Sequence, residues 1–88
     1  MKVRLFAALR EIVGASWVDA DVAGTADTGA VLEALAAAYG DEFRRIALAG
    51  TVVVNGEPAG WDRPLGPRDE VALLPPVSGG SGAGRRPR

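Results

Sequence analysis

The chain has 88 residues, which is enough for one domain with a single hydrophobic core and excludes a multidomain enzyme. Hydrophobic residues make up 48% and charged residues 24%, the balance typical of a folded soluble domain. Ten basic and 11 acidic residues give a net charge of −1, so the overall charge attracts neither nucleic acid nor an anionic membrane, and we expect neither as a partner.

Cysteine and histidine are both absent from the chain. Their absence excludes disulfides, thiol nucleophiles, zinc sites built on these residues and an imidazole base near neutral pH. The sequence also lacks a run of about 18 apolar residues and a segment typical of a secretory signal. We therefore expect a cytoplasmic protein that binds no metal and whose reactive group is not a usual catalytic side chain.

The first elements predict an antiparallel pair of strands. Residues 1–6 alternate between apolar and polar as a half-buried strand does, except that Phe6 falls on the polar face. Residues 7–13 have the spacing of a short helical turn that ends at Gly14, and residues 16–22 alternate again. Two strands joined by so short a connection pair most simply as antiparallel neighbours.

The main helix is predicted over residues 30–39. Its apolar residues fall on one face, and Gly40 ends it. Side-chain oxygens suited to capping its first turn come from three residues: Thr25, Asp27 and Thr28. Residues 41–49 are predicted to form a loop or a further turn, with three apolar side chains tucked under the sheet: Phe43, Ile46 and Leu48.

The second half of the chain predicts a hairpin and a last strand. Residues 51–54 form a β-branched run that ends in Asn55-Gly56, the commonest two-residue hairpin signal. Pro58 keeps the returning strand short or at a sheet edge, because proline cannot donate to a strand ladder. After an irregular segment at 61–68, residues 71–74 form the final strand.

This order of elements predicts an α+β domain, in which a mixed sheet of about five strands packs on one main helix. The apolar first and last strands fit side by side in the centre of the sheet, which is the layout of the ubiquitin-like β-grasp fold. We place the domain at residues 1–78, a Gly-Gly arm at 79–80 and a disordered basic extension at 81–88. Trp17 and Trp61 are assigned to packing, and the carboxylates of Asp69 and Glu70 to a solvated loop.

Three segments resemble the small subunit of molybdopterin synthase, within the sulfur-carrier family of the MoaD and ThiS type. They are residues 3–11, the strand end and turn Val54-Asn55-Gly56, and the closing segment from Pro64 to Gly80, with its Pro-Pro-Val-Ser-Gly-Gly end. The resemblance extends over residues 1–80, and the closing segment is its most specific part.

The resemblance implies that Gly80, as a free C-terminal carboxylate, is the reactive group. A ubiquitin-activating-like adenylyltransferase would use ATP to adenylate it, and sulfur transfer would then give a thiocarboxylate. The larger synthase subunit would receive this sulfur to build molybdopterin. The chain would be a co-substrate that is not catalytic on its own and binds no cofactor. Gly79 and Gly80 suit this role, because without β-carbons the arm can thread a narrow channel.

The resemblance and the strand alternation together predict a docking surface. Phe6 and Leu74 are expected to face solvent on adjacent strands, with Pro58 nearby, and the arm adds four further partner-binding residues: Pro75, Pro76, Val77 and Ser78. The alternative is that a loop partly covers this face of the sheet. The docking hypothesis requires that Phe6→Ala weaken binding to the synthase partner.

Residues 81–88 depart from the family pattern, because a peptide bond at Gly80 cannot be adenylated as a carboxylate can. The extension carries +3 from three arginines, whereas residues 1–80 carry seven basic and 11 acidic groups, or −4. A maturation peptidase that cuts after Gly80, a cloning remnant and a lapsed carrier role all account for it. Two other functions stay open: a carrier for another sulfur pathway (thiamine, cysteine or a thio-metabolite), and a non-reactive ubiquitin-like interaction module.

Overall fold

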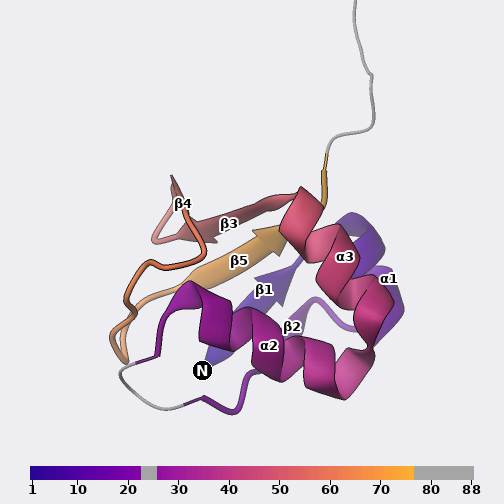
Figure 1. The fold of residues 1–88 in the computed structure, drawn as a ribbon, viewed down its shortest axis with the longest axis horizontal. Helices are drawn as coiled ribbons and strands as arrows, with labels where there is room; N and C mark the ends of the chain where they lie inside the picture. The colour runs from indigo at the N-terminus through magenta and orange to yellow at the C-terminus, as the bar shows by residue number, and fades with distance from the viewer. Residues whose placement is uncertain (23–25, 77–88) are drawn as a thin grey trace, which may run out of the picture.

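The computed structural model describes residues 1–22 and 26–76 of the chain (Figure 1). It contains three helices and five strands within this part of the chain. Their bounds in chain order are β1 Lys2–Leu5, α1 Ala7–Val13, β2 Trp17–Asp19, α2 Thr28–Tyr39, α3 Asp41–Ala49, β3 Thr51–Val54, β4 Glu57–Ala59 and β5 Val71–Leu74.

The strands form one mixed sheet in the order β2-β1-β5-β3-β4. The central pair β1 and β5 is parallel, and the other three pairs are antiparallel. The first and last strands therefore lie side by side, as the sequence predicts, and β1 and β2 form the expected antiparallel pair. This is the ubiquitin-like β-grasp fold.

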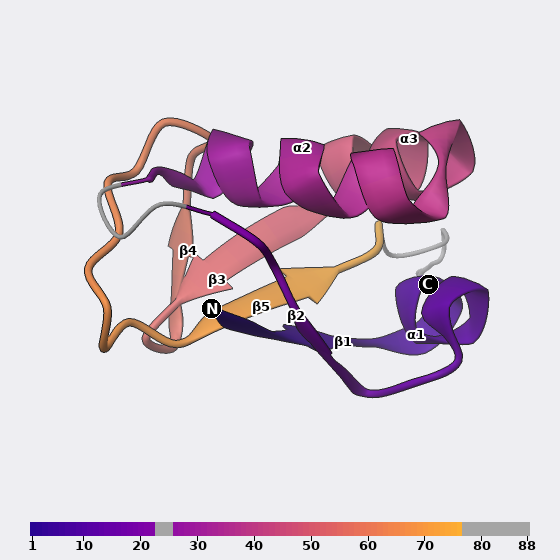
Figure 2. The ribbon, with the colours of Figure 1, turned by 90° about the horizontal axis from the view of Figure 1, so that it is seen from below.

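The core lies between the sheet and the helical layer, which Figure 2 shows along one side of the sheet. Alternate residues of the central strands point into it, including Val3 and Leu5 of β1 and Val71 and Leu73 of β5. The helices contribute buried side chains, among them Leu32, Leu35 and Phe43. Because successive strand residues point to opposite faces, the remaining strand side chains lie on the other face of the sheet, away from this core.

Helix α2 begins at Thr28, two residues before the predicted start, and of the three predicted capping residues Asp27 is its N-cap. The Asp27 side chain accepts a hydrogen bond of 2.8 Å from the Ala30 amide, which satisfies one of the free N–H groups of the first turn. Gly40 ends the helix with φ at 106°, a left-handed conformation that favours glycine.

Residues 41–49, predicted as a loop or a further turn, form the nine-residue helix α3, so the prediction of a loop is wrong. Gly40 redirects the backbone rather than ending helical structure, and the carboxylates of Asp41 and Glu42 favour a new helix N-terminus. Phe43 and Ala47, four residues apart, are buried on one face, so two helices and not one cover the sheet. Leu48 is 49% exposed and does not lie under the sheet as expected.

The Asn55-Gly56 turn joins β3 to β4 as predicted. Both residues have positive φ, 53° and 84°, as a two-residue type I′ hairpin turn requires. The Asn55 side chain does more than turn the chain: its amide donates to Asp69 at 2.9 Å, and its oxygen accepts from the Glu70 amide at 2.9 Å. The turn is thereby fastened to the segment that leads into β5.

Asp69 is a structural junction rather than a solvated loop charge. Its carboxylate accepts hydrogen bonds from the Gly66 amide at 2.8 Å, the Asn55 amide at 2.9 Å and the Arg63 guanidinium at 3.2 Å. Hydrogen bonds from the Gly66 backbone amide, foremost, and the Asn55 side chain hold the pKa of Asp69 below its ordinary value; desolvation opposes them, and Arg63 lowers the pKa further.

We expect Asp69→Asn to destabilise the domain at neutral pH and to have less effect in acid. A folded-state pKa below the unfolded value gives a contribution that is present above the unfolded pKa and is lost as pH falls through the folded pKa. Urea unfolding of parent and variant at pH 7 and near pH 3 measures this. Asp62→Asn, at an exposed position in the same loop, is the matched control. An Asp69→Asn deficit that is the same at both pH values would contradict the assignment.

Candidate functional site

The face of the sheet opposite the core carries a continuous row of side chains, one from each strand. The Cα register places Trp17 opposite Arg4, Arg4 opposite Ala72, Ala72 opposite Val53, and Val53 opposite Pro58. Directly paired residues project to the same face of a sheet. We call this surface the outer sheet face, defined by the row Trp17, Arg4, Ala72, Val53 and Pro58.

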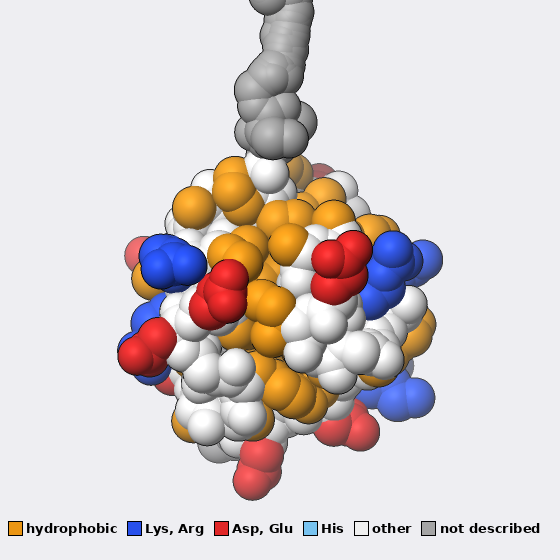
Figure 3. All heavy atoms as spheres, turned by 90° about the vertical axis from the view of Figure 1, so that its right-hand side faces the viewer, with side chains coloured by type: hydrophobic (Ala, Val, Ile, Leu, Met, Phe, Trp, Pro, Cys, Tyr) orange, Lys and Arg blue, Asp and Glu red, His pale blue; other side chains and the backbone are white. Residues whose placement is uncertain are grey.

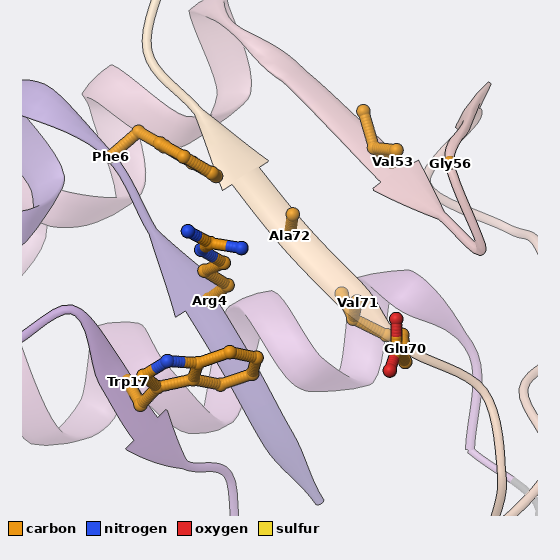
Figure 4. A pocket seen from close by; sticks show the side chains of 8 residues that line it. All are labelled: Arg4, Phe6, Trp17, Val53, Gly56, Glu70, Val71 and Ala72. Atoms are coloured by element: carbon orange, nitrogen blue, oxygen red, sulfur yellow. The ribbon is translucent and has the colours of Figure 1, made fainter.

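Arg4 is held between two aromatic rings on this face (Figure 4). Its guanidinium carbon lies 5.1 Å from the centroid of Phe6 and 5.6 Å from the centroid of Trp17, both within the range of a cation–π interaction. The assignment of Trp17 to packing is wrong, because the residue is 49% exposed. The sequence signal was present: Trp17 alternates in phase with Asp19, on the polar side of β2.

A shallow hollow of about 160 Å³ lies against this arrangement (Figure 4). It contains one cation and one carboxylate, from Arg4 and Glu70, and its other side chains are apolar. The complete lining is Arg4, Phe6, Trp17, Val53, Gly56, Glu70, Val71 and Ala72. The hollow therefore combines an apolar surface with one charged group of each sign.

The predicted docking residues lie at different places on the sheet. Phe6 follows β1, is half-buried and lines the hollow. Leu74 ends β5, is half-buried and comes directly after Leu73, which pairs with Leu5 of β1. Pro58 is exposed on the edge strand β4, and β5 and β3 lie between it and β1. Phe6 and Leu74 thus end neighbouring strands, whereas Pro58 is about 14 Å from β1 at the usual strand spacing.

The end of β5 is fixed against the turn that follows α3. A β-carbon on Gly50 would lie 1.9 Å from the carbonyl oxygen of Leu74 and 2.9 Å from the Pro75 backbone, far inside contact distance. Only glycine permits this approach, and no sequence signal singled out Gly50. Pro75 is half-buried and Pro76 is exposed; Val77, Ser78, Gly79 and Gly80 lie outside the described residues. Figure 3 shows apolar side chains gathered on one face of the molecule, close to the end of the described part of the chain.

The described residues hold neither a metal-ligand cluster nor a helix that could span a membrane. Within 1–22 and 26–76, no three His, Cys, Asp or Glu side chains cluster as metal ligands would. None of the helices in that part of the chain is both long and apolar enough to cross a membrane. The outer sheet face and the adjoining end of β5 together form the candidate site.

A β-grasp sheet whose central last strand is followed in the sequence by a Gly-Gly pair is the architecture of the small ubiquitin-like proteins. The model of the ThiS family matches residues 3–80, nearly the whole chain. The chain belongs to the ThiS family of sulfur carriers.

The chain is similar to the small archaeal modifier protein 1 of Haloferax volcanii, with 37% identity over 91% of this chain and 100% of the relative. The crystal structure of that protein superposes with a TM-score of 0.73 at 39% identity, over 91% of this chain and 98% of the other. A Pyrococcus furiosus protein described as molybdopterin converting factor subunit 1 gives a TM-score of 0.72, over 86% and 95% of the two chains. At 24% identity that likeness bears on the fold alone.

Proposed function

We propose that this protein carries sulfur as a thiocarboxylate at Gly80. The freed carboxylate attacks the α-phosphate of ATP on an adenylyltransferase, which forms the acyl adenylate and releases pyrophosphate. A sulfide-equivalent donor then attacks the acyl carbon and displaces AMP, leaving the thiocarboxylate. The observation that carries this proposal is the family match, which runs through both glycines to residue 80.

The length of the arm supports a role for the folded domain as a docking handle. Four residues lie beyond Pro76 up to Gly80, and four residues span at most about 14 Å. An enzyme that holds the Gly80 carboxyl in its active site must therefore bring its surface against the domain around the end of β5. Phe6 and Leu74 lie at that end of the sheet, which favours them over Pro58 as primary contacts.

We expect Phe6→Ala to weaken binding of the adenylyltransferase by about 10- to 100-fold. Withdrawal of an aromatic side chain from water contributes roughly 1.5–3 kcal/mol, and each 1.4 kcal/mol is about tenfold in affinity. Isothermal titration calorimetry measures the change. Tyr39→Ala is the matched control, since Tyr39 is an exposed aromatic on α2, among the helices on the other side of the sheet. Equal affinities of parent and Phe6→Ala would remove Phe6 from the docking surface.

Molybdopterin synthesis is the pathway we propose, with the larger molybdopterin synthase subunit as the sulfur acceptor. The Pro-Pro-Val-Ser-Gly-Gly end favours it over thiamine, cysteine or thio-metabolite pathways. A second candidate is protein modification, favoured by the 37% identity to a protein named as a modifier. Both uses start from the same acyl adenylate: an amine of a target protein would give an amide where a sulfur donor gives a thiocarboxylate.

The proposal requires that residues 81–88 be removed, for which we infer a peptidase that cuts after Gly80. Intact-mass measurement on the protein from its native cell tests this. The expected species ends at Gly80, and part of it carries the mass increase of one oxygen replaced by sulfur. Amide-linked conjugates of this species would favour the modifier role. Recovery of the full-length chain alone would count against both roles and would favour a non-reactive interaction module.

A further inference from the structure

We propose that Arg4 selects the partner of the outer sheet face by pairing with an Asp or Glu side chain of that partner. The inference rests on the proposed function, in which an adenylyltransferase docks on this face. It adds how the partner would be recognised: by an acidic side chain of the partner, set within an apolar contact surface.

Within the described part of the chain, Arg4 shares the lack of an ion pair with Arg10 and Arg68, and it differs from them by its contacts with two aromatic rings. Arg44, Arg45 and Arg63 each form an ion pair with a carboxylate of this chain. Within residues 1–22 and 26–76, no carboxylate oxygen lies within 4.0 Å of Arg4, although Glu70 lines the same hollow. Its interactions are with the rings of Phe6 and Trp17 instead.

The position of Arg4 makes its charge decisive for any protein that covers this face. Arg4 lies between Trp17 and Ala72 in the row across the sheet, and the rest of that row is uncharged. A partner seated on Phe6 would remove the guanidinium from water. A buried charge without a partner is strongly unfavourable, and aromatic stacking offsets only part of the lost hydration. Because the described residues supply no carboxylate to Arg4, the docking protein has to supply one.

The rings also prepare Arg4 for this contact. The cation–π contacts with Phe6 and Trp17 restrict the long side chain before the partner arrives, which reduces the entropy lost on binding. The N–H donors of a guanidinium match a planar carboxylate in a two-pronged geometry. An apolar partner surface would therefore be rejected, and an acidic one accepted.

The test is the affinity of Arg4→Met for the ubiquitin-activating-like adenylyltransferase of the same organism, measured by calorimetry with the full chain and with the chain ended at Gly80. Methionine keeps an apolar side chain on the strand and removes the charge. We expect affinity to fall by roughly 30-fold or more, because the partner's carboxylate is then buried without its counter-ion. The affinity of the parent should also fall with added salt more steeply than that of the variant.

Lys2→Met is the matched control, because Lys2 is an exposed cation two residues earlier on the same face of β1. Its affinity should stay within about twofold of the parent, as for a charge at the rim of an interface. Arg4→Gln, a second neutral variant, should reproduce the loss, and thermal unfolding checks that each variant is folded. If the parent binds and both Arg4 variants bind as tightly, this inference is overturned while docking through Phe6 stands. If the parent does not bind, both this inference and the proposed docking through Phe6 are overturned.

Discussion

A chain ended at Gly80 should be adenylated, whereas the 88-residue chain should not. The reactive group in the proposed function is a carboxylate, and in the longer chain the same carbonyl belongs to the peptide bond to Ser81. An amide oxygen is a far poorer nucleophile toward ATP than a carboxylate, and eight further residues would also have to fit past the active site. Exchange of labelled pyrophosphate into ATP, with the adenylyltransferase of the same organism, measures acyl adenylate formation directly.

A chain ended at Gly79 is the control for reach. It keeps the domain, the docking surface and a glycine carboxylate, but its reactive group stops about 3.5 Å short. Misplacement by as little as 1 Å can cost about 100-fold in rate, so exchange should fall by at least that factor relative to the Gly80 end. Binding measured by calorimetry should change little. Comparable exchange by the 88-residue chain and the Gly80-ended chain would refute the requirement for a free carboxylate at this position.

The central features of the fold were accessible from local patterns. Alternating apolar residues in 1–6 and 71–74 indicated two strands with one buried face each. Asn55-Gly56 indicated a hairpin turn, because both residue types adopt the positive φ that the turn requires. Helix α3 was not accessible in the same way. Nine residues are too few for an isolated helix to be stable in water, and this one depends on burying Phe43 and Ala47 in the common core.

The candidate site was likewise predictable only in the features that depend on local sequence pattern. Strand alternation correctly placed Phe6 opposite the core-facing residues of β1, because that property depends on period alone. The contact of Arg4 with Trp17 depends on the register between β1 and β2, which a connecting segment sets and alternation does not reveal. The distance of Pro58 from β1 was not predictable from alternation either. It follows from the strand order, which puts two strands between Pro58 and β1.

Gly50→Ala should be the most damaging small substitution at the base of the arm. The new β-carbon would lie 1.9 Å from the Leu74 carbonyl oxygen, and since the obstacle is backbone, no side chain can rotate away. Either α3 or the end of β5 must shift, and overpacking of this kind costs about 2–3 kcal/mol. For a domain of this size the midpoint of thermal unfolding should fall by roughly 8–24 °C.

Gly66→Ala is the control for the loss of a glycine as such. A β-carbon there would meet its nearest neighbour, the Asp69 carboxylate, at 3.9 Å, an ordinary contact distance. This variant should therefore unfold within a few degrees of the parent. Because Gly50 lies against Leu74 and Pro75, the Gly50→Ala change should also displace the point from which the arm starts, and a Gly80-ended chain that carries it should exchange pyrophosphate more slowly even below its unfolding temperature. Parent-like stability and exchange in Gly50→Ala would mean that the end of β5 is not held where the close approach of these two backbones places it.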